Sequence, residues 1–519
     1  MSTKRKIIKA TAVIFLFSVV GKALGFMREM IIAAKFGTTA NTDAYFVGLS
    51  GPDFIREIIS GGVLTAVFIP AYAQALKQKP KEESDQLFSN ITSLLMLVLS
   101  IAIVVGMCFP GIVVHIVAPE LNDVTFLSAA MITRILFPAM FFMGIASLYG
   151  NLLNVHERFV APASAQTLLN IGIIAGVIVL TKLWGVNSIA IGFLVGAILQ
   201  WLVLLPSVSK LNIRHAFSLR LLPETKTLLI SMIPLFFASL FSTANDLISR
   251  GLAAGLDPGS VSALNFANRL RETPWLFCGV PLATAAFPFM SNNAGPDERK
   301  HFTDILIFAL RLTAFLAIPL CAILFVFNIP IIQILFQRGK FDTVSTALTA
   351  YALRFASVGA AFYAINYVIL RAYYSTQKVT FLLITYAAAL IVNLGLGIIL
   401  RKYWAIGGIT CARSISEVVI FVFLLVYLKT ILKGLQPLRQ CGYITGLCLM
   451  TFFAAAGGFL VYTLFPHYAG LSGMILRLVV SSTTVLVLYA IVGLLFGNKE
   501  MSEFVMLIKS RLARRNALV

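Results

Sequence analysis

The chain has 519 residues, of which 59% are hydrophobic and 12% are charged, and its mean hydropathy is +0.92. Because soluble globular proteins carry about 25% charged residues, this composition excludes a soluble protein and indicates an integral membrane protein. The net charge of +20 would suggest nucleic-acid binding in a soluble chain, but here membrane topology must explain it first, and no nucleic-acid partner is expected.

The apolar residues occur in unbroken runs of about twenty, which excludes a β-barrel and predicts an all-α polytopic membrane protein. A window of about nineteen residues predicts about fourteen transmembrane helices. The first half are expected at Ile7–Ala34, Thr42–Leu76, Gln86–Pro110, Val124–Leu153, Ala161–Leu180, Ile189–Val208 and Glu224–Ala254. The second half are expected at Val261–Met290, Phe302–Phe327, Thr346–Tyr374, Val379–Leu400, Ile406–Leu428, Gly442–Phe465 and Leu471–Phe496.

The loops between these helices are short, so they leave no room for a soluble domain. Lys and Arg concentrate in the loops on the side of the amino terminus, which predicts that both termini lie in the cytoplasm. The basic and apolar start imitates a secretory signal, but Lys22 interrupts the small-residue site and many apolar segments follow, so we expect no cleavage.

Basic residues inside the predicted helices need a separate explanation. A charge at the bilayer centre costs about 2.5–3.5 kcal/mol on insertion scales, so such residues usually face a polar cavity or a partner. They are Lys22, Arg28, Arg56, Arg134, Arg250, Arg269, Arg271, Arg311, Arg354, Arg371, Arg413 and Arg477.

In the first helix, Gly21 and Gly25 lie one and two turns before Arg28, on roughly the same face. This pattern indicates either an anion-binding wall with room for a ligand, or close helix contact with Arg28 paired to Glu29 or snorkelling to the interface.

The second helix begins with Asp43 and contains Pro52 and the pair Gly61–Gly62, where a helix can kink or unwind. Arg56 lies between these positions, either as a second cavity cation or as part of a local ion-pair cluster with Asp53 and Glu57.

In the eighth helix, Asn265, Arg269 and Glu272 share one polar face. That face points inward to a cavity, or Arg269 and Glu272 neutralise one another.

Other charged positions have the spacing of internal salt bridges, namely Asp246 with Arg250 and Arg413 with Glu417. Alternatively, Asp246 with Asn366 or Asn393 could form a coupling-cation site of oxygen ligands. The last two helices are almost free of charge, which suits lipid contact or the groove for an acyl or isoprenoid chain.

No catalytic or cofactor motif is present. The sequence lacks a zinc-binding H-E-x-x-H, a paired cysteine motif and a G-x-x-x-x-G-K-[ST] phosphate loop. We therefore expect a transporter, not an enzyme, without cofactor or metal, driven by an ion gradient, the membrane potential or the substrate gradient.

A weak internal echo suggests two related lobes. The segment ending at Pro70 is similar to the one around Pro288, and each belongs to the second helix of a six-helix set. We expect an amino-terminal lobe over residues 1–222 and a carboxy-terminal lobe over 223–435, around a central cationic cavity, with two extra helices and a basic cytoplasmic tail over 436–519. Chance similarity of small and apolar residues is the alternative.

The chain resembles the MurJ/MviN family of lipid II flippases, within the multidrug/oligosaccharidyl-lipid/polysaccharide exporter superfamily. The resemblance covers essentially the whole chain. It is carried by LGFMREMIIAAKFG at Leu24–Gly37, TDAYFVG at Thr42–Gly48, the segment Pro52–Pro70, ERFVAPASAQTLLNI at Glu157–Ile171, NRLRETP at Asn268–Pro274 and LFQRGKF at Leu335–Phe341.

The resemblance implies that the protein moves lipid II, the undecaprenyl-diphosphate-linked peptidoglycan precursor, from the inner to the outer leaflet of the bacterial cytoplasmic (inner) membrane, for cell-wall biogenesis and cell shape. It implies substrate-binding cations at Lys22, Arg28, Arg56 and Arg269, and acids in gating or ion-pair roles at Asp43 and Glu272. Family members often have Arg where this chain has Lys22, and a second basic residue where it has Glu57, so the local charge differs.

Membrane lipids and cell-wall synthesis proteins are candidate partners, and a monomer suffices for alternating access. Three other functions remain open: a flippase for another undecaprenyl-linked glycan, a cation-coupled multidrug exporter, and a non-transporting scaffold. The net basic charge of the expected cavity disfavours cationic drugs, and the short loops disfavour a scaffold.

Overall fold

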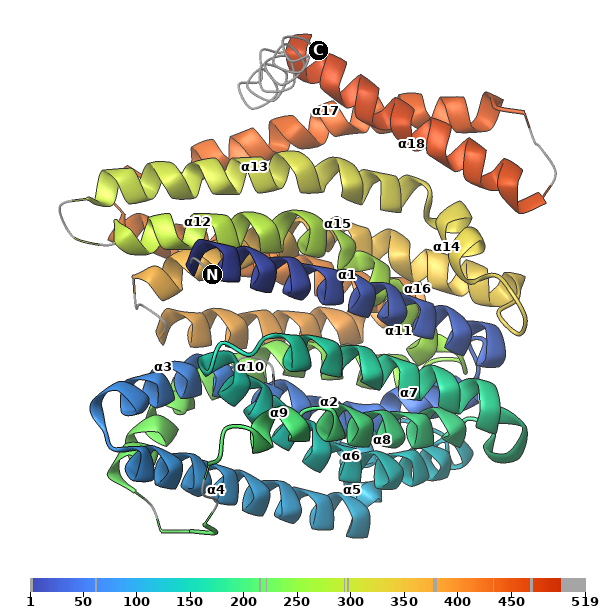
Figure 1. The fold of residues 1–519 in the computed structure, drawn as a ribbon. Helices are drawn as coiled ribbons and strands as arrows, with labels where there is room; N and C mark the ends of the chain where they lie inside the picture. Colours follow the sequence, from blue (N-terminus) through green and yellow to red (C-terminus); the bar gives the residue numbers. More distant parts are fainter. Residues whose placement is uncertain are drawn as a thin grey trace, which may run out of the picture. The chain divides into compact units, whose positions relative to one another are not determined.

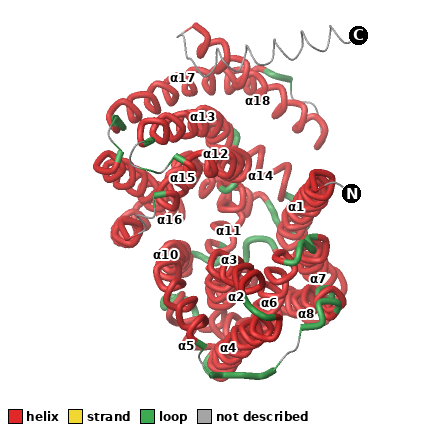
Figure 2. Tube along the Cα trace, turned by 60° about the vertical axis from the view of Figure 1, so that its left-hand side comes forward, coloured by secondary structure: helices red, strands yellow, loops and turns green. Residues whose placement is uncertain are grey.

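The computed structural model describes residues 3–60, 63–213, 216–220, 222–293, 295, 298–376, 380–432, 434–466 and 470–495. Within these ranges the chain forms helices joined by short turns, with no β-strand (Figures 1 and 2). This confirms the expected all-α class. Ten helices among the described residues are long and apolar enough to cross a membrane, so the protein is a multi-pass membrane protein, while the expected number of fourteen spans stays a prediction.

The chain divides into two compact units, and the first comprises residues 1–262 with 338–345. Its helices are α1 (Thr3–Phe36), α2 (Ala40–Ser60), α3 (Val63–Gln78), α4 (Lys81–Cys108), α5 (Pro110–Val117), α6 (Asp123–Val155), α7 (Val160–Trp184), α8 (Asn187–Leu202), α9 (Leu205–Ser209) and α10 (Pro223–Ala254).

The second unit comprises residues 263–337 and 346–519. Its helices are α11 (Ser260–Arg271, whose first turn belongs to unit 1), a π-helix (Trp275–Gly279), α12 (Val280–Asn292), α13 (Arg299–Val326), α14 (Asn328–Phe336), α15 (Thr343–Ser375), α16 (Thr380–Ile431), α17 (Pro437–Leu464) and α18 (Gly470–Leu495). Because α10 groups with unit 1, the units do not follow the predicted lobe boundaries after residues 222 and 435, which stay predictions.

The helices follow the predicted spans with a few added breaks. The predicted second span is divided into α2 and α3, and its expected unwinding at Gly61–Gly62 lies outside the described residues. The eighth span is interrupted by the π-helix. Helix α16 contains non-helical backbone at Trp404 and Ala405, where φ of Ala405 is +44°, so it consists of the two spans expected on either side of residues 401–405. The predicted basic tail lies mostly beyond the described residues, which end at 495.

Helix α6 is the central element of unit 1, because it packs against α2, α4 and α8. Near its end, Tyr149 joins an aromatic core with Phe68, Tyr72 and Phe88. The ring centres of the contacting pairs lie 5.3–6.3 Å apart. Burial of large aromatic side chains contributes strongly to packing energy. This core fixes α3 and α4 against α6.

Helices α7 and α8 pack so closely that their backbones are in contact. A Cβ atom added at Gly172 would lie 2.3 Å from Cα of Gly196, and one added at Gly176 would lie 2.5 Å from Cα of Gly192. Both helices therefore carry a G-x-x-x-G pair at their contact, the pattern that lets membrane helices pack closely. The close contact holds α7, which in turn packs against α1.

Helix α13 organises the packing of unit 2, since it contacts α12, α17 and α18. Its Phe315 accepts a hydrogen bond at the backbone oxygen from Tyr489 of α18, at 3.1 Å, and the two rings lie 5.3 Å apart. Helices α17 and α18 also pack on one another. The last two predicted helices therefore belong to the packed structure of this unit.

Candidate functional site

Arg28 is held between two helices of unit 1. Its Nη2 lies 2.5 Å from Oε1 of the neighbouring Glu29, and its Nη1 donates to Oδ1 of Asn170 on α7 at 3.2 Å. The amide of Asn170 also donates to the backbone oxygen of Gly21, at 3.1 Å. Both members of the ion pair are largely buried, with side-chain exposures of 15% and 6%.

The small residues before Arg28 serve helix contact in this structure. A Cβ atom added at Gly25 would lie 3.7 Å from the amide nitrogen of Asn170, so α7 occupies the space above that residue. The expected alternative of a close contact with an Arg28–Glu29 pair is therefore what this structure contains. Arg28 Nε is buried and has no hydrogen-bond partner among the described residues.

Lys22 lies on α1 six residues before Arg28. Its side chain is exposed and makes no hydrogen bond or ion pair with the part of the chain that the structure describes. An ammonium group in this position is a mobile point charge on a flexible stem. Lys22 can therefore reach an anion without first giving up a carboxylate.

Arg56 is at the centre of a charged cluster on α2. Its Nε and Nη2 both lie 2.7 Å from Oδ1 of Asp53, and Nη2 lies 3.7 Å from Glu57. Arg250 of α10 adds a second cation, because its Nη1 donates to Ser50 at 3.1 Å and its Nη2 lies 3.9 Å from Asp53. The expected local cluster is present, and Arg250, which sequence spacing pairs with Asp246, joins it; the pair Asp246–Arg250 stays a prediction.

Asp43 has backbone partners. Its Oδ2 accepts the amide proton of Gly259 at 2.6 Å, and its Oδ1 accepts that of Ser262 at 2.7 Å. The carboxylate is buried, with 4% exposure. A carboxylate with two backbone donors is well satisfied without a cation. Its expected pairing with a cation stays a prediction for another conformation.

Two motif segments meet beside Asp43 in unit 1. Lys340 donates its amide proton to the oxygen of Ala34 at 2.8 Å, and Thr38 donates its hydroxyl to Ser345, also at 2.8 Å. Gly339 has φ of +61°, and a Cβ atom there would lie 2.2 Å from the Ala34 oxygen. The glycine in the LFQRGKF motif is thus required by a tight turn against the end of α1.

In unit 2, Arg269 near the end of α11 forms the expected pair with Glu272, the residue that follows this helix. Arg269 Nη1 lies 3.3 Å from Oε2 of Glu272, and the side chains are 46% and 37% exposed. Such an exposed pair contributes at most about 1 kcal/mol, so a stronger anion can displace the carboxylate at little cost. The pair is compatible with both readings of the sequence.

The next arginine of α11, Arg271, lies about 200° around the helix from Arg269, on its opposite side, and is buried. Arg271 lies 4.0 Å from Oε1 of Glu417, which also pairs with Arg413 at 2.9 Å. The internal i,i+4 salt bridge expected for Arg413 and Glu417 is therefore confirmed. Asn393 is fully buried on α16.

The proposed cation site lacks support from a ligand cluster. The described residues contain no group of three or more His, Cys, Asp or Glu side chains that could hold a metal ion. Asp246 is in unit 1 and Asn393 in unit 2. Their assignment as a coupling-cation site stays a prediction.

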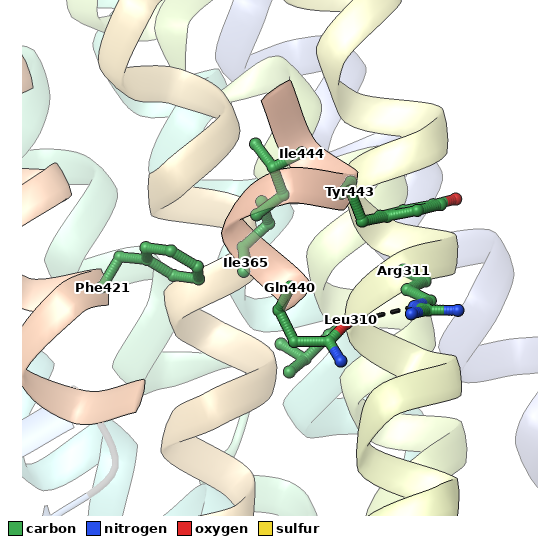
Figure 3. Close-up of a pocket in the computed structure, with 8 residues that line it drawn as sticks. Leu310, Arg311, Ile365, Phe421, Gln440, Tyr443 and Ile444 are labelled. Carbon is green, nitrogen blue, oxygen red and sulfur yellow. Dashed lines mark hydrogen bonds between the residues drawn. The ribbon is translucent and has the colours of Figure 1, made fainter. Parts of the chain in front are cut away.

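A small pocket lies in unit 2 between α13, α15, α16 and α17 (Figure 3). In it Arg311 donates to the side-chain oxygen of Gln440 at 3.1 Å and lies 4.7 Å from the ring centre of Tyr443. The remaining lining is apolar, formed by Leu310, Ala314, Ile365, Phe421 and Ile444. The hydrogen bond to Gln440 and the contact with the Tyr443 ring explain how Arg311 is tolerated among apolar side chains inside a predicted span.

These arrangements share one chemical property. Arg28, Arg56 and Arg269 each have a carboxylate partner within reach, yet a guanidinium carries five donors and can serve two acceptors at once. Sequence reasoning gave no role to Asn170 and paired Arg250 with Asp246, without finding its contact with Asp53. Asn170 lies in the motif ERFVAPASAQTLLNI, where a buried amide in an apolar helix is the signal that could have identified it.

Comparisons with known proteins agree with one another. A sequence model of the family described as "Lipid II flippase MurJ" matches residues 32–491. The chain is 31% identical over 352 residues to "Lipid II flippase MurJ" of Burkholderia cenocepacia, covering 66% of this chain and 68% of that protein. It is 28% identical over 422 residues to "Probable lipid II flippase MurJ" of Thermotoga maritima, covering 81% and 85%.

Solved structures show the same fold. One described as "Lipid II flippase MurJ, inward closed conformation" has a TM-score of 0.79 at 24% identity and covers 92% of this chain and 99% of its own. An inward-facing multidrug resistance MATE family transporter of the MOP superfamily has a TM-score of 0.67 at 15% identity, covering 80% and 96%. Both likenesses concern the fold alone.

Proposed function

The chain belongs to the lipid II flippase MurJ family, and we propose that it flips lipid II across the cytoplasmic membrane of a bacterium for peptidoglycan synthesis. The observation that supports this most strongly is the match of the family over residues 32–491, which includes Arg56, Arg250 and Arg269. The proposal assigns a transport activity, and no chemical step on the substrate is required.

The substrate explains why arginines belong inside this protein. Lipid II has a diphosphate and sugar head and a long apolar tail, so it cannot cross the bilayer core without losing the hydration of its charges. Guanidinium groups replace that hydration, because each can bind phosphate oxygens through two parallel hydrogen bonds. An apolar chain with basic residues placed in its helices meets both demands.

We assign head-group binding to Lys22, Arg28 and Arg56 of unit 1 and to Arg269 of unit 2. In unit 1, Arg28 is oriented by Asn170 and balanced by Glu29, so the guanidinium is held in one direction before the ligand arrives. Such preorganisation lowers the entropy lost on binding. Lys22, which is exposed, adds an uncommitted charge.

Release of the head group follows from the same contacts. Glu29, Asp53 and Glu272 are carboxylates beside the three arginines, and each can take back its arginine when the diphosphate leaves. Exchange between two anionic partners keeps binding reversible, because neither state leaves an arginine uncompensated. We assign this exchange role to Glu272 in particular, in line with its gating or ion-pair prediction, and a cation-paired state to Asp43.

The remaining features of the proposal concern topology and energy. Both termini lie in the cytoplasm, transport proceeds by alternating access, and the membrane potential or an ion gradient drives it. The tail of lipid II stays in lipid along a groove bordered by α17 and α18. Cell-wall synthesis proteins are candidate partners, and one copy of the chain suffices for transport.

Complementation tests the proposal. We would express the parent chain and the variants Arg28→Gln and Arg269→Gln at matched membrane levels in bacteria whose own lipid II flippase can be switched off. We expect growth with the parent and lysis with either variant, while Arg299→Gln, an exposed control on α13, grows like the parent. Growth of both site variants would overturn the residue assignments.

The second candidate is a flippase for another undecaprenyl-linked glycan, since the same diphosphate would be bound by the same arginines. Failure of a well-inserted parent chain in the complementation assay, together with rescue of a strain lacking an O-antigen or exopolysaccharide flippase, would favour this candidate.

A further inference from the structure

Unit 2 contains a group of arginine and aromatic side chains that the proposed function does not use. We call Arg271, Trp275, Tyr363, Tyr367 and Arg371 the arginine–aromatic cluster. Arg271 ends α11, Trp275 begins the π-helix, and the other three lie on α15. The ring of Trp275 is 5.6 Å from those of Tyr363 and Tyr367. The guanidinium of Arg271 lies 5.2 Å from the ring centre of Tyr363.

Arg271 is buried without adequate partners. Its exposure is 4%, and neither its Nε nor its Nη1 has a hydrogen-bond partner among the described residues. The carboxylate that it faces, Glu417, lies 4.0 Å from Nη1, which is too far for a hydrogen bond. A buried guanidinium with two unmade hydrogen bonds is costly, because arginine cannot lose its proton in a protein.

Glu417 cannot neutralise this charge alone. Its Oε1 receives Arg413 at 2.9 Å, and its Oε2 receives the amide of Asn366 at 3.1 Å. Two buried arginines therefore face one carboxylate, which leaves one positive charge in an apolar interior. Among the residues that the structure describes, the other acids of the second unit, Glu272, Glu298 and Asp304, are not buried. Uncompensated buried charge costs several kcal/mol in proteins.

The unsatisfied atoms of the cluster are of one chemical kind. Besides Arg271, Trp275 Nε1 and Arg371 Nε are buried and have no partner in the described part of the chain. All of them are N–H donors that can bind only an acceptor. Water would satisfy two of these donors without supplying charge, whereas a small anion supplies both several acceptor directions and the missing negative charge.

We propose that the arginine–aromatic cluster is a binding site for one small inorganic anion, which in a cell is chloride. The anion accepts hydrogen bonds from Arg271 and Trp275 and balances the charge that Glu417 leaves over. The π-helix that begins at Trp275 turns its indole toward α15, where Tyr363 and Tyr367 hold it. The site does not depend on which lipid-linked glycan the protein moves.

Ion binding to the purified, folded full chain tests the proposal. Chlorine NMR line broadening and thermal unfolding would be measured in chloride and in gluconate at one ionic strength. The parent should broaden the chloride signal, bromide should compete, and the transition temperature should rise with chloride concentration, as mass action requires for a ligand of the folded state. A parent chain whose line width and transition temperature do not respond to chloride would overturn the proposal.

Two variants locate the site, one that removes a positive charge and one that removes a negative charge. Arg271→Met keeps a flexible, unbranched apolar stem and removes the charged guanidinium, and it should weaken chloride binding by at least about tenfold, the size expected for losing a hydrogen bond to a charged group. Glu417→Gln removes the competing carboxylate and should tighten binding. The exposed control Arg299→Met should bind like the parent. Equal binding by the parent and Arg271→Met would place the ion elsewhere and contradict the proposal.

A second readout covers the case in which Arg271→Met does not fold. Bromide soaked into the parent protein would be located by its anomalous scattering, and Glu417→Gln would be titrated in parallel. A bromide peak between Arg271 and Trp275 supports the site, and bromide peaks at other positions only would overturn it. Loss of lipid transport in Glu417→Gln with tightened chloride binding would concern the transport cycle and would still support the site, whereas unchanged chloride binding in this variant would contradict it.

Discussion

Arg28 and Asn170 show how one amide can position a cation inside an apolar bundle. Asn170 accepts from the guanidinium and donates to the backbone of Gly21, so it links the charged residue to its own helix through α7. Asn170 thus fixes a direction for Arg28, while Glu29 provides the compensating charge.

Replacing this amide should therefore impair function more than stability. We expect Asn170→Ala to lower stability by about 1 kcal/mol, the net worth of one or two hydrogen bonds, and to slow lipid transport as Arg28 loses its fixed orientation. The measurements are the thermal transition and the transport rate of the purified chain. The control Asn292→Ala changes an exposed amide and should alter neither; unchanged transport in Asn170→Ala would show that Arg28 needs no positioning.

Asp43 allows a second prediction at this scale. Its carboxylate accepts two backbone amides, at Gly259 and Ser262. Asp43→Ala leaves both donors buried, which costs about 1–3 kcal/mol per group, whereas Asp43→Asn keeps one acceptor oxygen. We expect the transition temperature to fall for both variants and to fall farther for Ala. Equal and small effects would show that the two amides find other partners in the folded protein.

Close backbone contact between α7 and α8 makes the helix pair sensitive to one methyl group. A Cβ atom at Gly172 would lie 2.3 Å from Cα of Gly196, whereas one at Gly395 would have no atom within 4 Å. We expect Gly172→Ala to destabilise by about 1–3 kcal/mol through overpacking, and Gly395→Ala to be neutral or stabilising by up to about 1 kcal/mol. Thermal unfolding of the two variants gives the comparison, and a tolerated Gly172→Ala would mean that the helices can separate.

The break within α16 offers a stabilising substitution. Ala405 adopts φ of +44°, a conformation that L-residues with a Cβ atom disfavour by about 1 kcal/mol. Ala405→Gly should therefore raise the transition temperature, while Ala388→Gly, inside the regular helix before the break, should lower it by about the same free energy. A decrease in both variants would contradict the strain assigned to Ala405.

The positions of the long helices could be predicted from the sequence, but the side-chain contacts between different helices could not. Unbroken apolar runs place the long helices within a few residues, although not the short α5 and α14, and the break between the halves of α16 follows from the basic and aromatic residues Arg401 to Trp404. Spacing along one helix also identified the Arg413–Glu417 and Arg269–Glu272 pairs. It could not reveal that Arg250 contacts Asp53, or Arg28 contacts Asn170, because those contacts join residues from different helices.

For the whole molecule, the sequence predicts on which side of the membrane the two ends of the chain lie, and this prediction needs its own test. The excess of basic residues predicts cytoplasmic termini, and an even number of spans requires both ends on one side. Fusion of a reporter that is active only in the cytoplasm, at either end of the chain, should give active protein in both cases. Activity at one end alone would require an odd number of spans and would contradict the fourteen-helix prediction.

The central claim is that arginines within the helices carry a diphosphate-linked lipid across the membrane. The most direct measurement reconstitutes the full chain in vesicles with fluorescent lipid II and follows the fraction that a membrane-impermeant reagent can modify. We predict transport by the parent and by Arg299→Gln, and a loss of at least about tenfold in Arg28→Gln, since a charge-assisted contact to phosphate is removed. Equal transport by Arg28→Gln and the parent, at equal protein in the vesicles, would contradict the account.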